Sequence, residues 1–198
     1  MESESLRRDV VVRRVAHVLV ALAPLYYLFP VELPFLGIRR WVLLIVFFAL
    51  VIGFEGIRLW KGLTILGLRP HEKDQIASFV WAAAGITLVL WVFEPDIASA
   101  TIIGMAIVDP LAGELRAANK SDRISIGVPI LAYFMICVAV LPVAGSRELL
   151  PVISLSVLGS IAAVAAERPK IDYVDDDFLM LVVPAVAMAL LSLVASTA

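Results

Sequence analysis

Asp109 is the residue of this sequence with the clearest potential for chemistry. It lies in an apolar run, and at a rise of 1.5 Å per helical residue it is about 10 Å deeper in that run than Arg116. A carboxylate inside hydrocarbon is costly and marks a functional site by default. Arg116 returns to the helical face of Asp109, and Lys120 follows it in the next loop. A carboxylate flanked by cations suits a metal-bound polyphosphate.

The residues around Asp109 predict a broken or kinked helix. Pro110 follows directly, removes a helical hydrogen bond and clashes with the carbonyl group of Ala106. Gly104 and Gly113 lie on either side. Broken helices at membrane depth are tolerated where they line a cavity, and they often mark binding sites. We therefore expect a binding cavity at Asp109.

A second set of carboxylates lies between residues 167 and 177 and ends in Asp175, Asp176 and Asp177. Acidic runs are commonly only solvated, and an aspartate can also cap the helix that follows it. However, Mg²⁺ prefers a few carboxylates combined with substrate phosphates. A metal site shared by Asp109, Asp176 and Asp177 is therefore our functional interpretation of this run.

Two pairs of ionisable residues lie within apolar stretches, and each pair is spaced to share one helical face. Arg14 and His17 form the first pair, and Glu55 and Arg58 form the second. Each has a structural interpretation beside a functional one, because the first pair could anchor to lipid headgroups and the second could satisfy itself as an ion pair. Residues 69–74 could likewise be a solvated cap.

These side chains must be positioned by membrane helices. The chain has 198 residues, of which 62% are hydrophobic, whereas a soluble domain of this length is nearer half apolar. A bilayer core takes about 20 apolar helical residues. We expect an all-α, polytopic membrane bundle of about seven helices that forms a single domain over residues 1–198. The predicted spans are residues 15–29, 41–60, 76–93, 97–115, 124–143, 149–166 and 178–194.

Basic residues predict the orientation of this bundle. Thirteen of the 16 Lys and Arg residues fall on one side of the predicted spans, and Arg39, Arg40 and Arg147 fall on the other. Because cytoplasmic loops carry excess Lys and Arg, the N-terminus is predicted to be cytoplasmic. The ionisable residues within the spans lie toward the same face, which is the strongest functional signal in the sequence. Short loops favour the plasma membrane of a prokaryote.

Several classes of function lack their signatures. The net charge of −2 gives no basic field for nucleic acid. The single Cys137 cannot form an intramolecular disulfide and is expected to be an inert, buried thiol. Gly62 and Gly67 have the spacing of a P-loop, but the required Lys-Ser/Thr does not follow them. The signature of CDP-alcohol phosphotransferases is also absent.

Four blocks together resemble the membrane-bound CTP-dependent polyprenol kinase family, which includes dolichol kinase, phytol kinase and the yeast diacylglycerol kinase. They occur in the family's order and on one predicted membrane side. The blocks are Arg13-Arg14-Val15-Ala16-His17; Glu55-x-x-Arg58 followed by Arg69-x-x-Glu72; Val108-Asp109-Pro110-Leu111-Ala112-Gly113 followed by Lys120; and Glu167 followed by Asp175-Asp176-Asp177 and Pro184. Val108 replaces a family glycine, and Asp177 replaces the asparagine of Asp-Asp-Asn.

The resemblance implies phosphoryl transfer from CTP to a lipid alcohol of the dolichol, polyprenol, phytol or geranylgeraniol type, with Mg²⁺ or another divalent cation. Asp109 would bind the cation or orient the hydroxyl group, and Lys120 and Arg116 would stabilise triphosphate charge. His17 would hydrogen-bond the nucleotide or accept a proton. The residues expected to shape the nucleotide site are Arg14, Glu55, Arg58, Arg69 and Glu72.

Other functions remain open at the level of sequence. A cytidylyltransferase that makes a CDP-activated lipid from CTP and a lipid phosphate would share the nucleotide and the metal. A small transporter or flippase would instead place charges near the bilayer centre, and a structural membrane subunit would need no site. The expected partners are the bilayer, the lipid alcohol and the nucleotide. The oligomeric state is open, and a homo-oligomer is one option.

Overall fold

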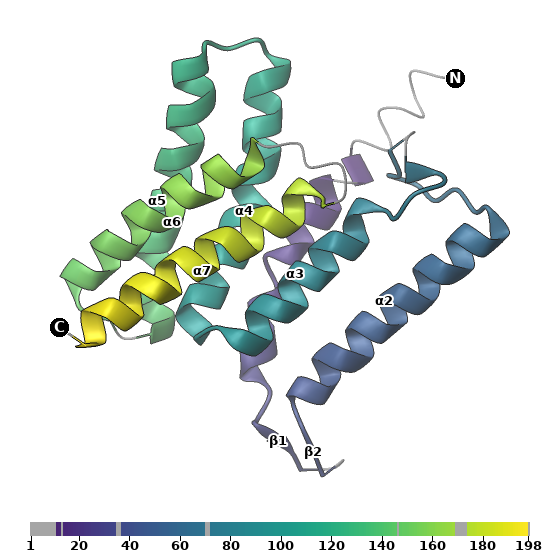
Figure 1. Cartoon of the computed structure of the whole chain (residues 1–198), viewed down its shortest axis with the longest axis horizontal. Coiled ribbons are helices and arrows are strands. Elements are labelled where there is room, and N and C mark those ends of the chain that lie inside the picture. The colour runs from purple at the N-terminus through teal and green to yellow at the C-terminus, as the bar shows by residue number, and fades with distance from the viewer. Residues whose placement is uncertain are drawn as a thin grey trace.

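Helices make up most of the protein, as the sequence predicts (Figure 1). The computed structural model describes residues 11–12, 14–34, 37–69, 72–145, 147–168 and 174–197. The long helices of this described part are α2 (Trp41–Lys61), α3 (Ser78–Val92), α4 (Pro95–Ala117), α5 (Asp122–Gly145), α6 (Leu149–Glu167) and α7 (Asp176–Thr197). The exception to the all-α expectation is a short antiparallel hairpin of β1 (Glu32–Leu33) and β2 (Ile38–Arg39).

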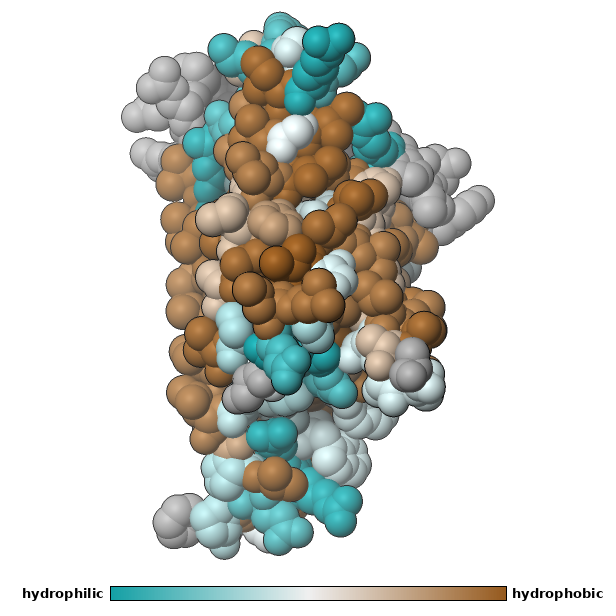
Figure 2. Space-filling model, turned by 90° about the vertical axis from the view of Figure 1, so that its left-hand side faces the viewer, coloured by the Kyte–Doolittle hydropathy of each residue, from teal (hydrophilic) through white to brown (hydrophobic). Residues whose placement is uncertain are grey.

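Five of these helices, α2, α4, α5, α6 and α7, are long and apolar enough to cross a membrane. Two shorter apolar helices, Arg14–Leu28 and Ser78–Val92, accompany them. Figure 2 shows a broad apolar surface on one side of the molecule, with polar side chains gathered above and below it. This distribution is typical of a polytopic membrane protein, because side chains that face lipid tails must be apolar.

The first predicted span is only partly α-helical, and Pro24 is the physical reason. Residues 14–20 form an α-helix, and the 3₁₀-helix η1 (Ala23–Leu28) follows. Between them, the backbone N–H groups of Ala21 and Leu22 donate to carbonyl groups only three residues earlier, at 3.1 and 3.0 Å. Proline lacks an N–H group and disfavours the α conformation in the residue before it, so the chain tightens here. The predicted apolar stretch 15–29 thus corresponds to the apolar helix Arg14–Leu28, which changes from α-helical to 3₁₀ geometry along its length.

Helix α4 lies at the centre of the bundle. It contacts η1, α3, α5, α6 and α7. About two-thirds of the residues in its most apolar 18-residue stretch are buried inside the protein. Of the break or kink predicted at Asp109, the break is wrong, because α4 continues through Pro110 to Ala117. Gly104 serves packing instead: a Cβ atom there would lie 2.5 Å from Cε2 of Tyr133 on α5. Because Gly104 has no side chain, α4 and α5 can approach closely at this position.

Helix α2 is the peripheral member of the bundle and lies at its edge in Figure 1. It contacts α3, and its buried residues are Leu44, Glu55 and Arg58. Large apolar side chains cover the rest of its surface, among them Phe47, Leu50 and Trp60. Such a surface suits contact with lipid tails.

Arg147 joins three elements at the end of α4 that lies away from Asp109. Its guanidinium group forms ion pairs with Glu94 and Asp96 and donates to Oγ of Ser192 at 2.8 Å. Asp96 is 2% exposed, and Gly145 leaves room for its side chain. The start of α4, the α5–α6 turn and the end of α7 are therefore held together by one cation.

Candidate functional site

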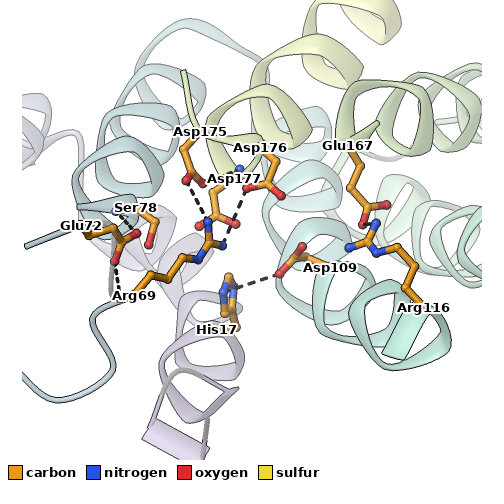
Figure 3. Close-up of polar contacts among 10 residues, drawn as sticks. All are labelled: His17, Arg69, Glu72, Ser78, Asp109, Arg116, Glu167, Asp175, Asp176 and Asp177. Atoms are coloured by element: carbon orange, nitrogen blue, oxygen red, sulfur yellow. Dashed lines mark hydrogen bonds and ion pairs between the residues drawn. The ribbon is translucent and has the colours of Figure 1, made fainter. Parts of the chain in front are cut away.

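Polar side chains from widely separated parts of the chain meet beside the N-terminus of α7 (Figure 3). They come from the first helical segment, the loop before α3, the second half of α4, the end of α6 and the start of α7. The members of this acidic cluster are His17, Arg69, Asp109, Arg116, Glu167, Asp175, Asp176 and Asp177. Most of the site residues predicted from the sequence are therefore brought together.

His17, Asp109 and Asp177 form one ligand group within the acidic cluster. Nε2 of His17 lies 3.6 Å from Oδ2 of Asp109, and the two side chains are only 11% and 17% exposed. One potential ligand atom of each of the three residues lies within 4.8 Å of the others. One imidazole and two carboxylates at these separations can bind a single metal ion.

Asp175, Asp176 and Asp177 form a second group with ligand atoms within 4.8 Å of one another. The predicted metal set of Asp109, Asp176 and Asp177 is therefore divided between two groups, and Asp177 belongs to both. Asp175 was missed as a site residue, although it stands in the same acidic run. Its Oδ1 atom also accepts the backbone N–H of Asp177 at 3.1 Å, so it caps α7 as well.

Asp177 is the most buried carboxylate of the acidic cluster, with 4% of the residue exposed. Its Oδ1 atom is buried and has no hydrogen-bond partner among the described residues. A buried carboxylate oxygen without a donor is destabilising, and such a group in a native protein commonly marks an ion site. The N-terminus of α7 offsets part of this cost, because helix dipoles favour negative charge there.

Arg69 supplies positive charge to the outer side of the cluster. Its guanidinium nitrogens lie 3.4 Å from Oδ2 of Asp175 and 3.9 Å from Oδ1 of Asp176. Burial acts to lower the pKa of Arg69, but the nearby aspartates outweigh it and raise the pKa overall. Burial, and then the neighbouring Asp176, raise the pKa of Asp175 to about 7. Arg69 is therefore a permanent cation beside a carboxyl group that titrates near neutral pH.

Glu72 positions the loop that carries Arg69. It is 4% exposed and accepts the backbone N–H groups of Arg69 at 2.7 Å and Ser78 at 3.1 Å. The second of these bonds caps the start of α3. Glu72 therefore acts on the site through the backbone of its neighbours.

Glu55 and Arg58 hold the same loop from the other side. They form a buried, bidentate ion pair with two N···O distances of 2.7 Å. Arg58 also donates to the carbonyl groups of Lys73 and Gln75, and Glu55 accepts the N–H of Ala77 at 2.8 Å. These contacts support a structural role for the Glu55–Arg58 pair. Among the described residues, the two side chains form hydrogen bonds with each other or with the loop before α3.

The remaining predicted cations lie closer to solvent. Arg116 is half-exposed and pairs with the buried Glu167, which was not predicted as a site residue. Arg14 pairs with Glu114 at the surface. The Lys120 side chain is exposed in the α4–α5 turn and makes no hydrogen bond or ion pair with the part of the chain that is described. That turn lies apart from the start of α7 in Figure 1.

Charge balance favours cation binding at this site. The acidic cluster contains five carboxyl groups, from Asp109, Glu167 and residues 175–177, but only Arg69 and Arg116 as cations among its described members. Partly buried carboxylates without counter-ions are strongly destabilising. A divalent cation relieves this excess directly, and a metal-bound polyphosphate would bring its own cation.

No protein-family model, curated protein or solved structure matches the chain. The function proposed for it therefore rests on its own residues and their arrangement.

Proposed function

We propose that the protein is a divalent-cation-dependent kinase that transfers the γ-phosphoryl group of CTP to the hydroxyl group of a membrane lipid alcohol. The observation that carries this proposal is the convergence of His17, Asp109 and Asp177 with Arg69 at one end of an apolar helical bundle. Phosphoryl transfer needs mainly positioning and charge neutralisation. The four sequence blocks that resemble polyprenol kinases support CTP as donor and a polyprenol-type alcohol as acceptor.

The carboxylates would bind a divalent cation such as Mg²⁺, which neutralises triphosphate charge when bound. Asp177 belongs to both ligand groups and is the best candidate for a permanent ligand. Asp109 would hold the cation or orient the acceptor hydroxyl group. Arg69 can release Asp175 and Asp176 to the cation and turn its guanidinium group to phosphate oxygens, because guanidinium binds both partners well.

An apolar groove offers a route for the hydrocarbon chain of the acceptor. It has a volume of about 380 Å³ and opens on the surface between α2 and α3. Its lining residues are Phe47, Leu50, Val51, Phe54, Ile65 and Phe79. Ile65 and Phe79 flank the loop that carries Arg69 and Glu72, so the groove borders the segment that reaches the acidic cluster. A chain in this groove could extend into the bilayer.

The proposed topology places the acidic cluster at the cytoplasmic face of a prokaryotic plasma membrane. Seven spans would arise from the five long helices together with Arg14–Leu28 and Ser78–Val92. The N-terminus and the connections around residues 62–77, 118–121 and 168–175 would then share one side, which carries most of the basic residues. A cytoplasmic site has direct access to CTP.

The proposal is tested with the purified full chain in lipid nanodiscs. The protein is incubated with Mg²⁺, γ-labelled CTP and a mixture of polyprenols, phytol, geranylgeraniol and diacylglycerol. We expect label in the lipid phase, and we expect Asp109→Asn to reduce its rate at least about 100-fold, because misplacing a reacting group by about 1 Å can cost about 10²-fold. Asp122→Asn is the matched control, because Asp122 is exposed at the start of α5.

The position of the label separates the alternatives. A cytidylyltransferase would release the γ-label as pyrophosphate and would transfer label from α-labelled CTP to a lipid phosphate. That result would replace the kinase proposal. If neither γ-labelled nor α-labelled CTP labels the lipid, both the kinase and the cytidylyltransferase hypotheses are rejected, and the transporter hypothesis is favoured.

A further inference from the structure

His17 and Asp109 are spaced as two ligands of one ion rather than as a hydrogen-bonded pair. Their 3.6 Å separation is too long for a hydrogen bond. Metal–ligand distances of about 2.0–2.2 Å place adjacent ligands about 3.0–3.6 Å apart in octahedral or tetrahedral shells. The distance between Nε2 and Oδ2 thus matches the edge of a coordination shell.

Asp177 provides an independent indication of a ligand at this place. It is 4% exposed, and its Oδ1 atom lacks a hydrogen-bond donor among the described residues. Figure 3 shows its side chain directed into the space between His17, Asp109 and Arg69. A buried oxygen that faces an imidazole and a second carboxylate is a favourable position for a cation.

The two ligand groups differ in chemistry. Asp175, Asp176 and Asp177 offer oxygen atoms alone, which suits Mg²⁺. His17, Asp109 and Asp177 offer one nitrogen and two carboxylates. Imidazole favours first-row transition metals over Mg²⁺, so the two groups are expected to select different cations.

We propose that His17, Asp109 and Asp177 bind a first-row transition-metal dication such as Mn²⁺ through the imidazole nitrogen of His17. This inference deepens the proposed function by naming a cation and its ligand, and it rests on that function only for the cation's role in catalysis. The site joins the first helical segment, α4 and α7, so a bound ion would fasten the N-terminal helix to the centre of the bundle.

The test uses the full chain in nanodiscs, without a histidine tag, loaded with Mn²⁺ and dialysed. Pulsed electron paramagnetic resonance detects the nuclear coupling of a nitrogen atom bound to Mn²⁺. We expect this coupling in the wild type and in the control variant His71→Ala. His71 is the chain's other histidine, and it lies outside the described residues. We expect His17→Ala to abolish the coupling.

A second variant distinguishes ligation from a structural role of His17. His17→Asp restores a ligand but supplies oxygen instead of nitrogen, so it should bind a cation without nitrogen coupling. Relative to wild type, His17→Ala should weaken Mn²⁺ binding at least about 10-fold, because loss of outer-shell partners alone costs about 10–100-fold. His17→Asp should shift the preference from Mn²⁺ toward Mg²⁺.

The inference is overturned if wild type retains no Mn²⁺, if retained Mn²⁺ shows no nitrogen coupling, or if the coupling persists in His17→Ala. Its failure is separable from failure of the kinase proposal. Lipid phosphorylation with Mg²⁺ and no nitrogen coupling would leave the kinase and remove this site. Nitrogen coupling without labelled lipid would do the reverse.

Discussion

Asp175 combines three roles in one side chain. It caps α7, pairs with Arg69, and belongs to the all-oxygen ligand group. Burial and the neighbouring Asp176 hold the pKa of this carboxyl group at about 7. Near neutral pH it is therefore poised between a protonated state and a charged state that a cation or Arg69 can stabilise.

This pKa predicts how the stability of the cation-free protein depends on pH. The pKa of Asp175 is higher in the folded state than the value of about 4 expected in an unfolded chain. Between pH 4 and pH 7 the folded state therefore binds more protons, and the contribution of Asp175 to the free energy of unfolding decreases as the pH rises through this window. Asp175→Asn should flatten this dependence.

The measurement is thermal unfolding in detergent with a chelator present, at pH values from 4 to 8. Asp122→Asn is the control, since its side chain is exposed at the start of α5 and lies outside the acidic cluster. An Asp175→Asn profile identical to that of the wild type would contradict the assignment.

The sequence predicted site residues whose own type and position are unusual. It did not predict residues whose role depends on contacts with distant parts of the chain. Asp109 was predicted because charge is rare in apolar runs. Asp176 and Asp177 were predicted from the acidic run before the last helix, and Arg69 from its place in a family-like block. The proximity of Asp109 and Asp177 was also predicted, but their division into two ligand groups was not, because helical spacing indicates which face a residue occupies and not which helix it meets.

Asp175 and Glu167 stand in the fourth sequence block but were not chosen as site residues, because their partners Arg69 and Arg116 are distant in sequence. For the same reason the sequence did not show that Glu55 holds the loop before α3.

At the scale of elements, the boundaries of the long helices were predicted closely. The stretches 41–60, 124–143 and 149–166 correspond to α2, α5 and α6, because apolar runs bounded by polar or turn residues leave few alternatives in a bilayer. Two prolines within apolar stretches have opposite effects on the backbone. Pro24 tightens its segment into a 3₁₀-helix, whereas α4 passes through Pro110 without a break. Packing on all sides of α4 overrides the local preference.

The close approach of α4 and α5 gives a prediction with a control on the same helix. Gly104→Ala should lower the free energy of unfolding by about 1–3 kcal/mol, because the new methyl group would clash with the ring of Tyr133. Gly113→Ala meets no atom within 4 Å and should be neutral or stabilising by up to about 1 kcal/mol. Denaturation in mixed micelles measures both variants. Equal effects at the two positions would contradict the assigned role of Gly104.

At the scale of the whole molecule, two networks of charged residues lie near opposite ends of the central helix. The acidic cluster lies near one end, and the Arg147 network lies at the other. The second network satisfies its charges internally, with Arg147 paired to Glu94 and Asp96 and bonded to Ser192. It therefore has the character of a stabilising network, whereas the acidic cluster contains more carboxyl groups than arginines among its described members.

Arg147→Met should be strongly destabilising, because it leaves the buried Asp96 without its cation. Removing one partner of a buried ion pair costs about 3–5 kcal/mol. Arg39→Met, at an exposed position of β2, should change stability by less than about 0.5 kcal/mol. Thermal unfolding in nanodiscs compares the two. A small effect of Arg147→Met would mean that the Arg147 network does not stabilise the fold.

The central position of α4 has a consequence for biogenesis. It has the lowest hydropathy of the five long helices and is the most enclosed by its neighbours. During synthesis it emerges before α5, α6 and α7, the helices that later cover most of it. Its Asp96 and Asp109 must then enter the membrane, or wait beside the insertion machinery, until Arg147 and the start of α7 have been made. Insertion of α4 should therefore depend on sequence that the ribosome has yet to translate.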